Sequence, residues 1–240
     1  MKKLLIIGSL LLAFPLTGQD IGSIGQQKPL SLSGSLNLNM STYATTRERP
    51  FRDPFLWTIS GNPTLSIYGI TLPFSFIISR RNEEFRQPFN QFGLSPYYKW
   101  MKVHLGFRSL SFSQYSLNGH VFNGIGLEAT PGNFRSGFMY GRLLEPIPPD
   151  ETALYPIQPT YLRKGYSVKL GYGTQSNYID LVLFKGWDDP NSIERPLDSA
   201  AVNPKENLVL ALKTQQRLFD RLMFSADIGI SGWTNNIFAA

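Results

Sequence analysis

The chain has 240 residues, of which 13% are aromatic and 17% charged, and it contains 21 glycines and 17 prolines. This composition favours strands and turns over helices, and the length suits one domain with a substantial core. The absence of cysteine excludes a disulfide framework and a cysteine-anchored lipoprotein. The formal net charge of +6 is spread along the chain without a basic cluster, which argues against nucleic acid as a partner.

The N-terminal segment has the pattern of a cleaved secretory signal. Two lysines precede an apolar run from Leu4 to Phe14, and Thr17–Gln19 forms a cleavage zone. A transmembrane anchor is the alternative, but an apolar run of about 11 residues is shorter than the roughly 20 that a spanning helix needs. The predicted division of the chain is a signal peptide over residues 1–19, a periplasmic lead-in over residues 20–29 and a β-barrel over residues 30–240.

From residue 30 onward, apolar residues recur at every second position in one segment after another. The clearest example is 30–42, where leucine and methionine alternate with serine and asparagine. Successive strand residues point to opposite faces, so this pattern predicts strands with one apolar face. About 11 strands are predicted, over residues 30–42, 56–68, 71–79, 96–101, 103–113, 121–129, 134–142, 166–172, 179–183, 208–212 and 222–231.

Three positions predict local irregularities in these strands. Pro63 suggests a bulge or a strand end, because proline cannot donate to the ladder. The apolar parity flips around Ser109, which predicts a bulge. Between 121–129 and 134–142, Pro131 is expected at the first central position of a type II turn, with Gly132 supplying the positive φ that follows.

The links between the predicted strands alternate in length, beginning with a long one. A soluble sandwich has no reason to sort its loops in this way, whereas an outer-membrane barrel has short periplasmic turns and long outer loops. Aromatic residues near several strand ends fit the girdles at the two membrane interfaces. We therefore predict an all-β fold, an antiparallel up-and-down transmembrane β-barrel in the outer membrane of a Gram-negative cell, with a secreted soluble β-protein as the alternative.

The predicted strand number is odd, whereas closed single-chain bacterial barrels normally have an even number. The last residues, 235–240, have the composition of the start of an outer loop. The expectation is an incomplete barrel of 12 or more strands from a truncated sequence. A missed strand, or a barrel closed by another chain, is the alternative.

Three stretches resemble a group of uncharacterised outer-membrane β-barrel proteins of Bacteroidota. They are GNPTLSIYGITLPFSFIIS at 61–79, the run from FRQPFNQFG to GFMYGR at 85–142, and RKGYSVKLGYGTQSNYIDLVLFKGWDD at 163–189. The resemblance implies the location and the fold. It brings no activity, cofactor or catalytic residue with it.

The non-apolar faces of the predicted strands carry charges of both signs. Rings of one sign select ions, so the mixture argues against a charge filter and predicts a paired internal network. The residues predicted to line the lumen are Arg108, Glu128, Arg135, Lys169, Asp180, Lys213 and Asp227. A polar loop rich in phenylalanine is the candidate constriction or docking loop, the alternative being an ordinary surface loop. Its candidate residues are Arg80, Arg81, Glu83, Glu84, Phe85, Arg86, Phe89 and Phe92.

Neither histidine has the spacing of a metal site or a catalytic triad. His120, expected near Ser113 and Ser116, makes a barrel hydrolase conceivable, but an isolated loop histidine is favoured because no motif surrounds it. His104 lies within a predicted strand. The oxygen-rich run Asp188–Asn191 lacks the further acids of a calcium loop and is interpreted as a solvated turn.

The predicted function is porin-like passage of solutes, or service as the membrane part of a transport or secretion assembly. The alternative is a barrel that anchors and displays its outer loops for binding. No enzymatic activity and no cofactor are predicted. The expected partners are outer-membrane lipid and other envelope proteins, and the solute is unidentified.

Overall fold

The structure, a computed structural model of the chain, describes residues 29–46, 54–80, 90–149, 158–194, 202–219 and 221–239. Within these ranges the chain forms strands and one short 3-10 helix at Ile237–Ala239. Helices long and apolar enough to cross a membrane do not occur in this described part. The predicted signal peptide lies outside it.

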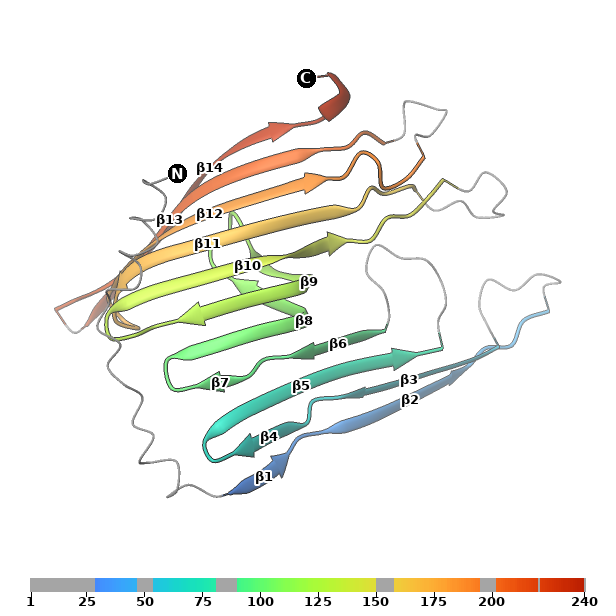
Figure 1. Cartoon of the computed structure of the whole chain (residues 1–240), viewed down its shortest axis with the longest axis horizontal. Helices are drawn as coiled ribbons and strands as arrows, with labels where there is room; N and C mark the ends of the chain where they lie inside the picture. The colour runs from blue at the N-terminus through green and yellow to red at the C-terminus, as the bar shows by residue number, and fades with distance from the viewer. Residues whose placement is uncertain are drawn as a thin grey trace, which may run out of the picture.

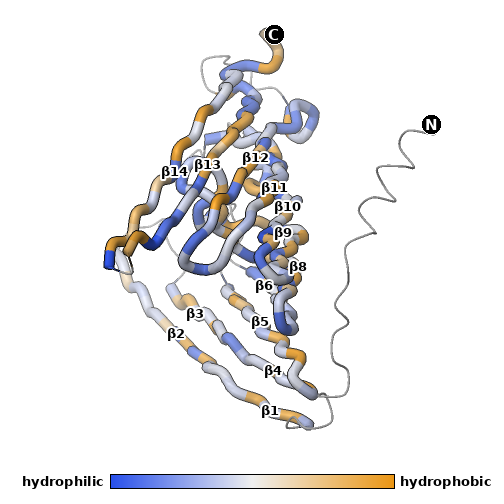
Figure 2. The backbone as a smooth tube through the Cα atoms, turned by 90° about the vertical axis from the view of Figure 1, so that its left-hand side faces the viewer, coloured by the Kyte–Doolittle hydropathy of each residue, from blue (hydrophilic) through white to orange (hydrophobic). Residues whose placement is uncertain are grey.

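The strands form one antiparallel sheet, so the predicted all-β, antiparallel architecture is confirmed (Figure 1). When β1 and β2, β3 and β4, and β6 and β7 are each counted as one crossing, consecutive crossings are neighbours in the sheet, as an up-and-down meander requires. Viewed from the edge that carries the short turns, the sheet curls into a barrel-like wall (Figure 2). The strands are β1 (Leu30–Ser33), β2 (Leu36–Thr42), β3 (Phe55–Gly61), β4 (Thr64–Ile67), β5 (Ile70–Ser79), β6 (Gln91–Leu94), β7 (Tyr97–Tyr98), β8 (Met101–Ser111), β9 (Asn118–Ala129), β10 (Phe134–Leu144), β11 (Arg163–Gly173), β12 (Tyr178–Asp188), β13 (Glu206–Leu218) and β14 (Leu222–Thr234).

The sheet has 14 strands where 11 are predicted, because three predicted crossings are each divided in two. The breaks lie between β1 and β2, between β3 and β4 at the predicted Pro63, and between β6 and β7. The first two breaks lie side by side, since the amide of Asn62 donates to the carbonyl of Ser35 at 3.0 Å. The predicted bounds 96–101 are wrong. This crossing begins at Gln91, within the predicted polar loop, and β8 already starts at Met101.

Short turns join the strands along one edge and long links along the other, as predicted (Figure 1). The predicted bulge near Ser109 is present as a register shift between Ser109 and Ser111. The turn after β9 differs from its prediction. The amide of Phe134 donates to the carbonyl of Pro131 at 3.1 Å, so Pro131 is the first residue of the turn. Gly132, with φ of 63°, therefore takes the first central position, an arrangement that suits the twist of a hairpin.

The two faces of the sheet differ sharply. Leucine, isoleucine and aromatic side chains of the outward face are widely exposed, for example Leu36 at 72% and Ile230 at 69%. The inner face carries the small, polar and charged residues of the same strands, together with one apolar cluster over β8–β13. The members of this cluster are Leu110, Phe112, Leu117, Phe122, Met139, Leu143, Val182 and Ala211, with Phe184 packed against them.

Candidate functional site

A row of charged residues crosses the inner face where five strands pair. Arg135 on β10 lies opposite Gly171 on β11, and Gly171 lies opposite Asp180 on β12. Asp180 in turn pairs with Lys213 on β13, and Lys213 pairs with Asp227 on β14. Strict antiparallel register therefore brings four of the seven predicted lumen residues into one line with alternating signs.

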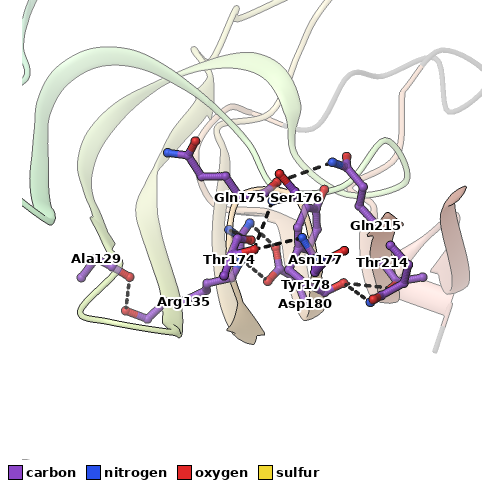
Figure 3. A network of polar contacts seen from close by, with 12 residues as sticks. Ala129, Arg135, Thr174, Gln175, Ser176, Asn177, Tyr178, Asp180, Thr214 and Gln215 are labelled. Carbon is purple, nitrogen blue, oxygen red and sulfur yellow. Dashed lines mark hydrogen bonds and ion pairs between the residues drawn. The ribbon is translucent and has the colours of Figure 1, made fainter. Parts of the chain in front are cut away.

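The strongest contact in this row joins Arg135 and Asp180 (Figure 3). The guanidinium donates from Nε to Oδ1 at 2.8 Å and from Nη2 to Oδ2 at 2.9 Å, in a two-pronged geometry that fixes both groups. The guanidinium also lies 4.1 Å from the ring centre of Tyr178. Gly171 lies between the two partners, and a Cβ there would come within 2.0 Å of the Asp180 carboxylate. The pair thus depends on a glycine in the strand between its members.

The link between β8 and β9, Phe112–Leu117, is the shortest on the edge of the long links. It folds over the inner face, and we call it the inward loop. Its ends are closed by a hydrogen bond from the amide of Phe112 to the carbonyl of Leu117 at 2.8 Å. Phe112 and Leu117 are each 1% exposed. The Phe112 ring lies 4.8 Å from the ammonium of Lys169, which is itself buried on β11. The loop therefore packs on strands that follow it by dozens of residues.

The far side of the inward loop is fixed to β14. The hydroxyl of Ser113 donates to Oδ1 of Asp227 at 2.7 Å, and the amide of Gln114 donates to Oδ2 at 2.9 Å. Tyr115 stacks over Gly229, where a Cβ would lie 2.7 Å from the tyrosine. One carboxylate on the last strand thus receives two hydrogen bonds from a loop that follows β8.

The constriction loop was expected elsewhere in the chain. Of its candidate residues, only Arg80 and Phe92 belong to the part that the structure describes. Phe92 lies on β6 rather than in a loop, and it is 49% exposed. The remaining candidates, Arg81, Glu83, Glu84, Phe85, Arg86 and Phe89, lie outside the described residues.

A second polar group on the inner face joins three neighbouring strands through His104 on β8. The hydroxyl of Ser95 lies 3.0 Å from Nδ1 of His104, and Nε2 of the same ring lies 3.1 Å from Oε1 of Glu128. Ser95 and His104 are 5% and 3% exposed. Sequence reasoning predicted Glu128 on this face but did not connect it with either residue.

Arg108 lies beside this group. Its guanidinium donates to the hydroxyl of Ser75 at 2.9 Å and to the carbonyl of Pro73 at 3.1 Å, while its buried Nε has no hydrogen-bond partner. The amide of Ser95 donates to the same carbonyl of Pro73 at 2.9 Å. A cavity of about 290 Å³ opens between these side chains. Its polar lining consists of Ser75, Gln91, Ser95, Lys102, His104, Arg108 and Ser109.

Two adjoining cavities of about 270 and 490 Å³ lie at the long-link ends of the last six strands, and we call them the mouth. Arg163, Lys205 and Trp233 line both. Asp188, predicted in a solvated turn, accepts two hydrogen bonds from Arg163 at 2.7 and 2.9 Å and ends β12. Among the described residues there is no group of three or more His, Asp or Glu side chains that could hold a metal ion.

The residues near His120 do not assemble into the hydrolytic site that sequence reasoning considered. Nε2 of His120 contacts the carbonyl of Leu143 at 3.3 Å, and Ser113 is bound to Asp227. His120 lines the mouth together with Ser116. Three buried polar atoms that line the mouth have no hydrogen-bond partner: Ser116 Oγ, Tyr161 OH and Asn207 Oδ1.

Compared with known proteins, the chain matches no family model, no curated protein and no solved structure. The resemblance to outer-membrane barrels of Bacteroidota therefore stays a prediction.

Proposed function

We propose that the chain is an outer-membrane β-barrel protein that takes part in the passage of solutes, with the inward loop as its constriction. The observation that carries this proposal is the contrast between the two faces of one sheet. Large apolar side chains cover the outward face from β1 to β14, including Leu30 at 64% exposed and Ile228 at 63%. On the opposite face, Arg135 pairs with Asp180 and His104 pairs with Glu128.

The outward face fits lipid better than water. Soluble monomers rarely expose continuous apolar patches larger than a few hundred Å², and this face spans the entire sheet. Aromatic residues lie near both ends of the strands, as interfacial girdles do. Tyr97 and Tyr172 lie beside short turns, and Tyr166 packs edge-on against Trp187, 6.1 Å between ring centres, towards the long links.

The inner face suits a narrow polar path. The alternating charges favour neither cations nor anions strongly, because selectivity for one sign needs a ring of that sign. The inward loop crosses this face and is held by Asp227. We therefore expect weakly selective passage that widens when the loop is released.

Conductance across planar lipid bilayers tests this function on the full chain. Wild-type protein should give small, weakly selective steps, and Asp227→Asn should give larger ones, since it weakens both hydrogen bonds that hold the loop. Asp189→Asn, at a half-buried ion pair next to a long link, is the matched control and should conduct like wild type. A wild-type protein that is monomeric in detergent-free buffer would contradict the proposal. So would identical current steps from wild type, Asp227→Asn and Asp189→Asn.

A second candidate function is the binding of a polar solute at the mouth. Three residues that line these cavities carry an unpartnered polar atom, and such atoms are costly unless a ligand or water satisfies them. The exposed indole of Trp233 also lines both cavities. Titration with small neutral sugars should change the tryptophan fluorescence of wild type but not of Trp233→Phe, whereas equal changes in both would remove this candidate.

A further inference from the structure

We propose that Ser95, His104 and Glu128 form an acyl-transfer site that hydrolyses a small carboxylic ester on the inner face. This activity lies beyond the passage of solutes and does not depend on it. Two contacts join the three side chains, Ser95 and His104 line a cavity, and Arg108 lines the same cavity.

Strand register places the three side chains on one face. Gly93 pairs with Gly106 and Tyr97 pairs with Lys102, so the break between β6 and β7 brings Ser95 opposite His104. His104 pairs with Gly126 on β9. Glu128 lies two residues further along β9 and therefore points to the same side as Gly126.

The hydrogen bonds give the imidazole the orientation that a general base needs. An ionised carboxylate can only accept, so the contact of 3.1 Å between Glu128 and His104 requires hydrogen on Nε2. In the neutral imidazole, Nδ1 is then unprotonated and accepts from the hydroxyl of Ser95 at 3.0 Å. A nucleophile, a base and a group that orients the base follow one another as in a serine hydrolase, with the two ring nitrogens in exchanged roles.

The surroundings define the substrate class. The cavity of about 290 Å³ admits a short acyl group and a small leaving group, and it does not admit a long lipid chain. Lys102 and Arg108 line it, which favours a substrate with an anionic group. Nη2 of Arg108 and the amide of Ser95 both donate to the carbonyl of Pro73, which brings the guanidinium close to Ser95. The Nε of the same guanidinium has no hydrogen-bond partner, so it can donate to the negatively charged oxygen that develops on the substrate carbonyl.

The proposed reaction consumes water and one ester. Ser95 Oγ attacks the ester carbonyl and passes its proton to Nδ1 of His104. The carbon–oxygen bond to the alcohol breaks, and the departing oxygen takes that proton. Water then attacks the acyl-serine, gives a proton to His104, and releases the carboxylic acid as the serine recovers its hydrogen. Glu128 accepts from Nε2 throughout and stabilises the imidazolium.

The competing explanation is that the three residues satisfy one another on the wall without reacting. Both explanations require the same static contacts, so the test must measure the reactivity of the Ser95 hydroxyl. The full chain, folded in detergent, is treated with a fluorophosphonate probe, and the modified peptide is identified by mass spectrometry. Initial rates with 4-nitrophenyl acetate and with an anionic 4-nitrophenyl succinate ester provide the second readout.

The proposal expects modification of Ser95 and hydrolysis that favours the anionic ester. Ser95→Ala should abolish labelling. His104→Gln and Glu128→Gln should slow labelling by about 100-fold or more, the usual range for a general base and its partner. Ser167→Ala is the matched control, because Ser167 is a fully buried wall serine that donates only to the carbonyl of Leu183 at 3.0 Å. It should leave labelling unchanged.

Several results would overturn the site. They are labelling at another serine, no labelling of folded wild type, or wild-type rates of labelling and hydrolysis in Glu128→Gln. Loss of hydrolysis in His120→Ala together with wild-type hydrolysis in His104→Gln would also overturn it. Folding of each variant is checked by its heat-dependent migration on gels. Bilayer conductance of Ser95→Ala should match wild type, so the failure of the hydrolase proposal and that of the passage proposal can be told apart.

Discussion

The first seven strands and the last seven form one sheet, but they differ in length and in what covers their inner face. Strands β8 to β14 have 11 to 13 residues each, whereas β1 to β7 have between 2 and 10. Every residue of β1 and β2 is exposed. On β12, by contrast, buried and exposed residues alternate from its first position.

The difference lies in the filling of the inner face. Over the last seven strands, the inward loop adds Phe112 and Leu117 to a buried cluster that includes Phe122 and Met139. Period-two alternation is equally clear in β2 and in β12, so alternation produces the strands in both halves. The apolar cluster and the charge row both lie in the half that the inward loop covers. We infer that this half is the more stable one.

The largest effect on stability is expected from Asp180→Ala. Asp180 is 2% exposed and binds Arg135 through both oxygens. Its removal leaves a half-buried guanidinium without its carboxylate, which typically costs about 3–5 kcal/mol. Urea unfolding of the protein in lipid vesicles measures the loss. The control Asp189→Asn, at the more solvent-accessible pair with Lys164, should cost about 1 kcal/mol or less. Equal losses in the two variants would refute the buried network.

The comparison of the two halves is tested by removing one large side chain from each. Met139 is 0% exposed within the inner cluster, so Met139→Ala should cost about 2–5 kcal/mol. Leu38 on β2 is 58% exposed, and Leu38→Ala leaves no enclosed cavity. Its loss in the same urea titration should be the smaller of the two. If Leu38→Ala were as costly as Met139→Ala, the first half would be as tightly packed as the second.

Much of the sheet was predictable from the sequence, because strand periodicity and link length are local properties. The alternation in 134–142 and 179–183 predicted which residues share a face, and it assigned Arg135 and Asp180 to the same side. Pro63 predicted a strand break because proline has no amide hydrogen to donate, which interrupts the ladder at that residue. The lengths of the links predicted which strand ends lie at the same edge.

The remaining features depend on contacts between distant residues. The inward loop has no sequence signature, since Ser113 and Asp227 are 114 positions apart and only the curl of the sheet brings them together (Figure 2). The group around His104 was missed for a different reason. The bounds of the crossing before β8 were predicted incorrectly, so Ser95 was not aligned with His104. Correct pairing of that hairpin and of β8 with β9 would have revealed all three residues.

After Asp180→Ala and Met139→Ala, the smallest loss of stability is expected in the first half. There the break between β1 and β2 lies beside the break between β3 and β4. Gly34 has φ of 140°, and a Cβ there would lie 2.5 Å from the carbonyl oxygen of Asn62. Because the clash is with backbone, Gly34→Ala should cost about 1–3 kcal/mol, the range for local backbone strain. Gly232→Ala on β14 is the control, since a Cβ there meets nothing within 4 Å.

Hydrogen exchange shows where the loss from Gly34→Ala occurs. The amides of β1 to β4 should exchange faster in this variant, and those of β10 to β13 should keep the wild-type rates, because the inner cluster holds the second half independently. Faster exchange in β12 as well would mean that the two halves unfold as one cooperative unit, and that the packed inner face stabilises the whole sheet.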